Sequence, residues 1–212
     1  MATDPEAPLR ADARRNRDQI MAAAKVMFAR QGPDAPMEDI ARQAGVGVGT
    51  LYRRFPDRQA LIRAVAQDSF AALLAEAQAA VAEEPTAWDA LVRTVRQSGE
   101  VEVSVRLAIL SPLAASIFRD DPLTGRFRRE LLETVDGLVR AAQAEGTLRP
   151  DVSTADVTAL LSLLVARLPK LPGRSAWLVS ERALALMLDG LRAQPGTPLP
   201  GQPLTMEDLD LV

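Results

Sequence analysis

The sequence predicts an all-α protein, with a small three-helix head at its N-terminus and a larger helical body after it. Apolar residues recur at spacings of three and four through most of the chain, which is the period of an amphipathic helix. Pro and Gly cluster between these periodic segments, where helices are expected to end. Residues 101–105 alternate as a strand does, but a lone strand has no partner elsewhere in the sequence. We therefore expect helices throughout.

The composition makes an enzyme or a metalloprotein an unfavourable interpretation. The 212 residues include no Cys and no His, so disulfides, thiolate sites and the commonest general acid and metal ligand are missing. Two acidic pairs, Glu83 with Glu84 and Glu100 with Glu102, do not share a helix face. We expect no cofactor, no metal site and no catalytic site. We also find no secretory leader and no apolar run that would span a bilayer, so we expect a cytoplasmic protein without a membrane partner.

The centre of the predicted head is a pair of short helices. We expect the first over residues 37–44, a glycine-containing corner at 45–47, and the second over 48–54. Pro36 suits the first turn of the first helix, where its missing N–H is not needed. A longer helix over 15–31 packs behind the pair. This arrangement is a helix-turn-helix, whose second helix enters the major groove of DNA.

The second short helix has an apolar side and a polar side. Leu51 and Phe55 are four residues apart and turn inward. The exposed turn between them carries Thr50, Tyr52, Arg53 and Arg54. Their hydroxyl, phenol and guanidinium groups donate hydrogen bonds to phosphate oxygens. The head is also the basic end of the chain: residues 1–63 hold 11 Lys and Arg against 8 Asp and Glu, whereas residues 64–212 hold 14 against 20.

The segment IARQAGVGVGTLYRRFPDRQAL closely resembles the DNA-reading segment of tetracycline-repressor-like, or TetR-family, transcriptional regulators. The residues that match the family pattern are Ile40, Ala41, Ala44, Gly45, Val46, Gly49, Thr50, Leu51, Tyr52, Phe55 and Leu61. Gly47 stands where the family usually has Ser, which removes a side-chain cap from the second helix. Arg54 replaces the usual His and Arg58 the usual Lys, and both keep or add positive charge. The motif covers roughly residues 15–65; beyond it, only the all-helical plan agrees.

The resemblance implies a ligand-responsive transcriptional regulator, most often a repressor, that binds a near-palindromic site in double-stranded DNA as a homodimer. It also implies that Arg58 contacts a phosphate. The residues that we expect at the DNA surface are Pro36, Gly47, Val48, Gly49, Thr50, Tyr52, Arg53, Arg54 and Arg58. The alternative is a helical protein–protein adaptor whose basic end binds protein without specific DNA binding.

The chain is expected to have four parts. Residues 1–13 form a flexible arm, 14–60 the DNA-binding domain, 61–193 the helical effector-binding and dimerisation domain, and 194–212 a disordered acidic tail. The helices expected in and next to the body cover residues 58–83, 87–99, 122–145, 155–168 and 175–191, with another over 101–118 that kinks near Pro112. Their predicted caps are Asp57, Thr86, Gly146, and Ser153 or Thr154.

The last two helices are apolar around much of their circumference. A helix that is apolar on two sides needs a second surface to cover it. We predict that a second copy of the chain supplies this surface in an intermolecular four-helix bundle, as the resemblance also implies. The predicted interface residues are Leu160, Leu164, Leu168, Leu184, Met187, Leu188 and Leu191. The alternative is burial within the body of a single chain.

The effector pocket is the least specified feature. The body helices consist mainly of Ala, Leu and Val, so large or charged side chains in them are candidates to line a pocket. The predicted pocket residues are Phe70, Trp88, Arg106, Leu110, Phe118 and Trp177. An aromatic and Arg lining suits an apolar or weakly anionic effector. The alternative is that the aromatic residues are plain core and that Arg106 is exposed or salt-bridged.

Overall fold

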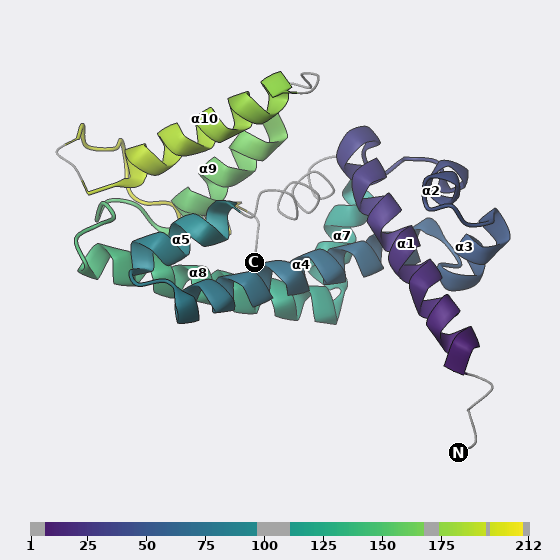
Figure 1. Ribbon diagram of the computed structural model, residues 1–212. Helices are drawn as coiled ribbons and strands as arrows, with labels where there is room; N and C mark the ends of the chain where they lie inside the picture. The colour runs from purple at the N-terminus through teal and green to yellow at the C-terminus, as the bar shows by residue number, and fades with distance from the viewer. Residues whose placement is uncertain (1–6, 97–110, 168–173, 194–195, 210–212) are drawn as a thin grey trace, which may run out of the picture. The chain divides into compact units, whose positions relative to one another are not determined.

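The computed structural model describes residues 7–96, 111–167, 174–193 and 196–209, and most of them are helical (Figure 1). The described helices are α1 (Ala7–Gln31), α2 (Met37–Gln43), α3 (Val48–Arg54), α4 (Arg58–Glu83), α5 (Ala87–Arg96), α7 (Pro112–Asp120), α8 (Pro122–Ala144), α9 (Thr154–Arg167), α10 (Arg174–Leu191) and the 3-10 helix η1 (Glu207–Leu209). Within these ranges there is no β-strand, and a single antiparallel bridge joins Leu148 and Arg192. The all-α prediction is confirmed.

The chain divides into two compact units. One unit comprises Met1–Asp68 with Arg106–Thr124, and the other comprises Ser69–Val105 with Gly125–Val212. The long helix α4 therefore contributes its first part to one unit and its second part to the other. This division differs from the predicted boundary at residue 60, and it assigns α7 to the unit that contains the head.

The head is built around α1, which packs against both α2 and α3 (Figure 1). Ile20 and Phe28 of α1 are fully buried, together with Ile40 of α2 and Leu51 of α3. Helix α1 begins at Ala7, so the prediction of a flexible arm over residues 1–13 is wrong for residues 7–13. The physical reason is that Ala and Arg are strong helix formers and that Pro is tolerated in a first turn.

Helix α7 begins at Pro112 instead of being kinked there. Ser111 is its N-cap, and the Ser111 hydroxyl accepts a hydrogen bond of 3.2 Å from the backbone N–H of Ala114. Pro112 occupies the first helical position, where no N–H is required. The predicted kink is therefore wrong, and residues 101–110 of that predicted helix lie outside the described residues. Capping predictions elsewhere are confirmed at Asp57, Thr86, Gly146 and Ser153.

The core of the second unit lies between α5, α8 and α10. Trp88 and Leu91 on α5 and Val139 on α8 are buried in it. Leu184 and Leu188 of α10 are buried in the same cluster, so α10 closes the core on one side. Helices α9 and α10 also pack against each other (Figure 1).

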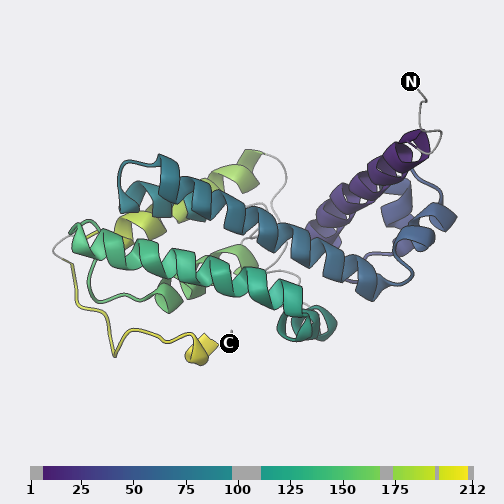
Figure 2. The same cartoon turned by 90° about the horizontal axis from the view of Figure 1, so that it is seen from below.

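The segment after α10 is more ordered than its composition predicts. Residues 196–209 form an extended segment that ends in η1, drawn in yellow in Figure 2. Backbone groups of Thr197, Leu199 and Leu204 are hydrogen-bonded to the connector between α8 and α9 or to the first turn of α9. The prediction of a disordered tail is therefore wrong for these residues. The composition of this segment does not predict these contacts, because backbone groups make them.

Candidate nucleic-acid interface

The corner between α2 and α3 has a specific backbone geometry. Gly45 has a φ of 68°, a left-handed conformation that L side chains rarely adopt. The N–H of Val46 donates to the carbonyl of Ala41 at 3.1 Å, and the N–H of Gly45 donates to that of Arg42 at 3.2 Å. This pair of hydrogen bonds is a Schellman motif, which ends α2 and satisfies its last carbonyls. The turn thereby directs the chain into α3.

Helix α3 has the apolar and polar sides that its sequence predicts. Leu51 is fully buried, and Phe55 directly after the helix is 4% exposed. The predicted contact residues on the other side are exposed or half-buried: Gly47, Val48, Gly49, Thr50, Tyr52, Arg53 and Arg54. Arg53 Nη2 donates to the Thr50 hydroxyl at 3.1 Å, which places a cation and a hydroxyl together on this surface. Pro36, also exposed, is the N-cap of α2.

Gly47 precedes α3 as its N-cap, and no side-chain hydrogen bond caps the helix there. The Gly47 carbonyl accepts the first bonds of the helix, from the N–H of Thr50 at 2.8 Å and of Leu51 at 3.1 Å. Its φ is −66°, which any L residue adopts. The cap is therefore missing because glycine has no side chain, and the backbone at Gly47 is not strained.

Arg58 makes contacts within the head that the resemblance does not imply. Its Nη1 donates to the carbonyl of Pro33 at 2.7 Å and to the carbonyl of Ala35 at 2.6 Å. The side chain is half-buried and holds the first turn of α4 to the loop between α1 and α2. Both hydrogen bonds come from Nη1, and they hold the loop that leads into α2 against the first turn of α4. The phosphate contact of Arg58 stays a prediction.

Sequence reasoning did not single out Arg17, an exposed residue of α1. Its guanidinium carbon lies 5.9 Å from the centroid of the Phe55 ring, within the range of a cation–π contact. This contact places a positive charge beside the end of α3. The available signal was its position three residues before the buried Ile20, which puts Arg17 at the edge of the inward face of α1.

Three of the predicted effector residues, Trp88, Phe118 and Phe70, have described side chains. Trp88 is a core residue of the second unit, and the guanidinium carbon of Arg192 lies 4.7 Å from its ring centroid. Phe118 is buried in the first unit, and Phe70 is half-buried in the second. Arg106, Leu110 and the side chain of Trp177 lie outside the described residues. Trp88 is therefore corrected to a core residue.

A cleft of about 360 Å³ lies elsewhere in the second unit, between the α4–α5 turn and α8. Most of its lining is small or apolar: Val81, Pro85, Thr86, Ala87, Ala90, Thr134, Gly137, Leu138 and Ala141, with the carboxylates of Glu84 and Glu133. Sequence reasoning missed it because no large or unusual residue marks the cleft.

The wall of this cleft at Glu84 is held by an ion-pair cluster. Arg93 of α5 donates to Glu76, Glu83 and Glu84 at 2.7, 2.8 and 3.0 Å. Hydrogen bonds to Glu83, then Glu76 and Glu84, raise the pKa of Arg93 above its ordinary value. The cluster ties α5 to the end of α4 and thereby fixes the turn that borders the cleft.

The predicted dimer residues differ in their burial within a single chain. Leu184, Leu188 and Leu191 are between 2% and 5% exposed within a single chain, so they are corrected from interface to core. Leu164 and Met187 are partly buried against that core, and Leu168 lies outside the described residues. Leu160 is exposed, as an interface residue must be in the separate chain. On α9 and α10, the exposed leucines that sequence reasoning missed are Leu163, Leu178 and Leu186.

These features define a helix-turn-helix protein with a helical second unit, and comparison with known proteins agrees. Residues 20–65 match the tetR family of bacterial regulatory proteins, and residues 108–193 match the C-terminal domain of SbtR-like transcriptional regulators. A TetR transcriptional regulator from Streptomyces coelicolor is 34% identical, covers 83% of this chain and 98% of its own, and has a TM-score of 0.59. A TetR regulatory protein from Mycobacterium vanbaalenii is 35% identical, with 87% and 99% covered and a TM-score of 0.60.

The chain also matches curated relatives over a shorter stretch of sequence. HTH-type transcriptional regulators from several strains of Staphylococcus aureus are 40% identical over 60 residues, which is 28% of this chain and 32% of theirs. The match thus spans about a third of the length of those relatives.

The chain belongs to the TetR family of transcriptional regulators and is a DNA-binding protein of that family. The relatives are regulators and not enzymes, and nothing in the comparisons favours the adaptor alternative. In the described ranges, no helix is long and apolar enough to cross a membrane.

Proposed function

We propose that two copies of this chain form a dimer that represses transcription from a near-palindromic DNA site and leaves that site when a small molecule binds the second unit. The observation that carries the proposal is the unpaired apolar surface on α9 and α10. The exposed polar side of α3 supports the DNA-binding part.

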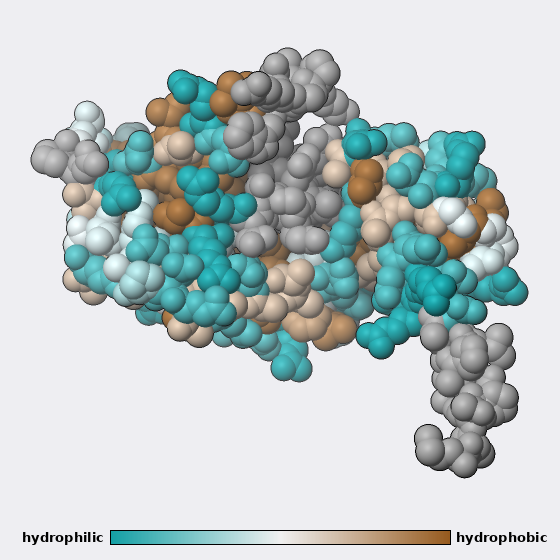
Figure 3. All heavy atoms as spheres, in the orientation of Figure 1, coloured by the Kyte–Doolittle hydropathy of each residue, from teal (hydrophilic) through white to brown (hydrophobic). Residues whose placement is uncertain are grey.

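The apolar surface consists of leucines that a single chain leaves in water. Leu160 and Leu163 of α9 are 42% and 59% exposed, and Leu178 and Leu186 of α10 are 48% and 69% exposed. Figure 3 shows brown apolar side chains over α10, among polar ones. Leu178 and Leu186 are eight residues apart, a spacing found within one apolar stripe of a helix. The same face of a second copy is a self-complementary cover, as two-fold symmetry requires. We call these four side chains the leucine face.

A two-fold dimer determines the kind of DNA that the two heads can read together. Each α3 presents Thr50, Tyr52 and Arg53 to one major groove. Two heads related by a two-fold axis match two inverted half-sites about 34–36 Å apart, or a multiple of that distance. This geometry favours a near-palindromic operator.

The cleft beside α8 is our candidate effector site. Its volume of about 360 Å³ is at the small end of the range for ligand pockets, and its lining suits a mainly apolar molecule. A ligand that binds more tightly to the conformation unable to hold DNA shifts the equilibrium by that difference in affinity.

The test of the dimer is Leu163→Glu, with Leu123→Glu as a matched control. Leu123 is also an exposed leucine, 43% exposed, but it lies at the start of α8 and outside the leucine face. Sedimentation and binding to DNA recovered by sequence selection are measured for both variants. We expect Leu163→Glu to be monomeric and to lose affinity for the full operator, and Leu123→Glu to behave as the native chain. A Leu163→Glu variant that stays dimeric contradicts the proposal.

The test of the effector site is Gly137→Leu. A Cβ at Gly137 meets no atom within 4 Å, so the leucine extends into the cleft without a backbone clash. Gly125→Leu is the control, because it makes the same change in α8 outside the cleft lining. Small molecules are first screened for release of DNA from the native protein. We expect Gly137→Leu to bind DNA and resist release, whereas equal release from both variants places the effector elsewhere.

A further inference from the structure

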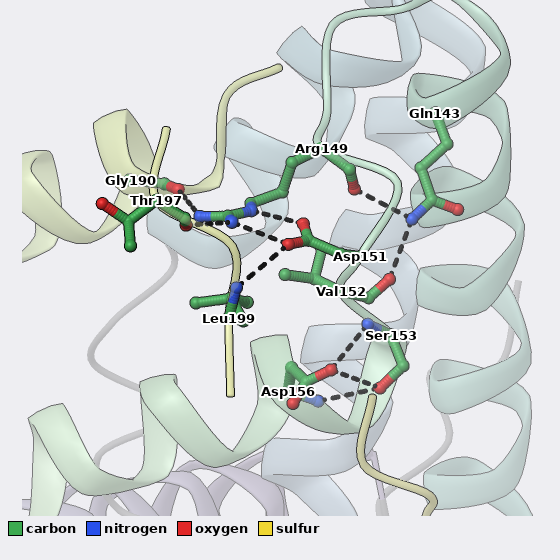
Figure 4. Close-up of polar contacts among 9 residues, drawn as sticks. All are labelled: Gln143, Arg149, Asp151, Val152, Ser153, Asp156, Gly190, Thr197 and Leu199. Carbon is green, nitrogen blue, oxygen red and sulfur yellow. Dashed lines mark hydrogen bonds and ion pairs between the residues drawn. The ribbon is translucent and has the colours of Figure 1, made fainter. Parts of the chain in front are cut away.

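The C-terminal segment 196–209 is attached to the second unit at two positions. At the first, Arg149 Nη2 donates to the carbonyl of Thr197 at 3.2 Å, and the N–H of Leu199 donates to Asp151 at 3.4 Å (Figure 4). Arg149 also makes two hydrogen bonds to Asp151, at 2.5 and 2.8 Å. This side-chain pair lies in the connector between α8 and α9, so the segment passes beside the connector.

The second attachment is at the first turn of α9. Ser153 and Asp156 form its capping box: the N–H of Ser153 donates to Asp156 at 2.8 Å, and the N–H of Asp156 donates to the Ser153 hydroxyl at 3.1 Å (Figure 4). The Ser153 hydroxyl also donates to the carbonyl of Leu204 at 2.6 Å, and the Leu204 N–H donates to Asp156 at 3.3 Å. Both backbone polar groups of Leu204 are therefore paired with the start of α9.

This second attachment lies on the helix face that carries the exposed leucines. Asp156, Leu160 and Leu163 follow one another at spacings of four and three, so they lie along one side of α9. The backbone of Leu204, a residue that is 38% exposed, is held at the N-terminal end of this row. A leucine distant in sequence thus lies where the row of exposed leucines on α9 begins.

We propose that Leu204 forms the outer edge of the subunit interface and that the second copy of the chain covers it. This inference rests on the dimer proposed above and extends it to the C-terminal segment. The backbone of Leu204 is hydrogen-bonded within its own chain, whereas the residue is 38% exposed. Asp156, which accepts from the Leu204 N–H, lies one helical turn before Leu160, so a partner seated on this row reaches the position of Leu204.

Leu199 provides a matched control within the same segment. It is 44% exposed, similar to Leu204, but its backbone is bonded to Asp151 of the connector and not to α9. A substitution at Leu199 changes the same kind of residue in the same extended segment. The two positions differ in whether they continue the leucine face.

The experiment measures the dimer dissociation constant by sedimentation for three full-length variants: Leu204→Glu, Leu199→Glu and Leu163→Glu. We expect Leu204→Glu to raise this constant by about tenfold or more, because it introduces a charge where a leucine would be covered. We expect Leu199→Glu to stay within about twofold of the native value, as an exposed site outside the interface should. Leu204→Ser, which introduces no charge, is expected to weaken the dimer in the same direction.

The possible failures are distinguishable. If Leu204→Glu and Leu199→Glu have equal effects while Leu163→Glu dissociates the dimer, the dimer stands and the role of Leu204 is overturned. If Leu163→Glu leaves the dimer intact, the proposed leucine face is wrong and the inference fails with it. Circular dichroism of each variant establishes that its helices are retained, and Leu204→Ser serves as the second reading if Leu204→Glu unfolds.

Discussion

The helix pair α2–α3 and the helix pair α9–α10 present different surfaces to water. In α3, Leu51 is buried, while Thr50, Arg53 and Arg54 lie on the outer side. In α10, Leu184 and Leu188 are buried, yet Leu186 between them is 69% exposed. The exposed side of α3 is mainly polar, with Val48 40% exposed, whereas α9 and α10 expose four leucines.

The two helix pairs therefore require different partners. The outer side of α3 is mainly polar and is solvated by water. A suitable partner therefore contributes negative charge and hydrogen-bond acceptors, as a DNA backbone does. The outer side of α9–α10 exposes leucine, so its partner gains free energy by covering apolar area. Salt should therefore weaken the first contact strongly and the second one little.

The largest effect we predict separates buried from exposed leucines within α10. Leu188→Ala should lower the free energy of unfolding by about 2–5 kcal/mol, because it leaves a cavity in the core. Leu186→Ala, two residues away, should change the unfolding of the separate chain by less than about 0.5 kcal/mol, as surface substitutions usually do. Denaturant unfolding at several protein concentrations distinguishes chain stability from dimer stability. Similar losses for both variants would remove the distinction between the two faces of α10.

The second prediction separates two arginines near the DNA surface. Arg58→Ala should weaken DNA binding by about tenfold or more, since it removes charge-assisted hydrogen bonds that position α2. It should leave the slope of log affinity against log salt unchanged. Arg53→Ala should reduce that slope by about one, as the loss of a phosphate contact does. The two slopes are measured by titration of operator DNA at several salt concentrations, and a reduced slope for Arg58→Ala would restore the phosphate contact that the resemblance implies.

Local signals predicted the head well. Leu51 and Phe55 were assigned inward because their spacing leaves a single apolar side, and Asp57 was identified as a cap by its side-chain chemistry alone. The role of Arg58 was not predictable in this way. Its acceptors are the carbonyls of Pro33 and Ala35, more than twenty residues away, and backbone acceptors leave no mark on a sequence.

In the body, the spacing of apolar residues does not predict which face of a helix is buried. The existence of α9 and α10 was predicted, but a helix that is apolar around most of its circumference does not reveal which side meets its own core. Leu184, Leu188 and Leu191 were therefore assigned to the wrong surface, and Leu186 was missed. The C-terminal segment was missed for another reason, because it docks through the backbone of Leu204.

The third prediction concerns acid sensitivity at the connector before α9. The hydrogen bond from Arg149 is the main cause that lowers the pKa of Asp151 from 3.8 to about 2. A carboxylate whose pKa is lower in the folded state stabilises that state above the unfolded pKa, and this contribution is lost as the pH falls toward the folded pKa. The native chain should therefore lose stability between about pH 4 and pH 2.

Asp151→Asn removes this titration. Its thermal midpoint should lie below that of the native chain at pH 5, and the two midpoints should converge as the pH approaches 2. The effect should be smaller than that of Leu188→Ala, because the Asp151 side chain is 39% exposed and solvent screens the pair. A constant difference between the two midpoints over this range would show that the ionised pair does not stabilise the connector.

The smallest effect we predict is a gain at the start of α3. Gly47→Ser should raise the free energy of unfolding by a few tenths of a kcal/mol, because the hydroxyl caps the helix where glycine offers no side chain. A Cβ at this position has its nearest neighbour, the Thr50 hydroxyl, at 3.9 Å, so the serine fits without a clash. Gly47→Ala is the control that adds the Cβ without the cap, and it should be less stable than the serine variant by about 1 kcal/mol. Thermal unfolding of the three proteins measures both differences, and equal stability of the serine and alanine variants would mean that α3 is held by Leu51 and Phe55 alone.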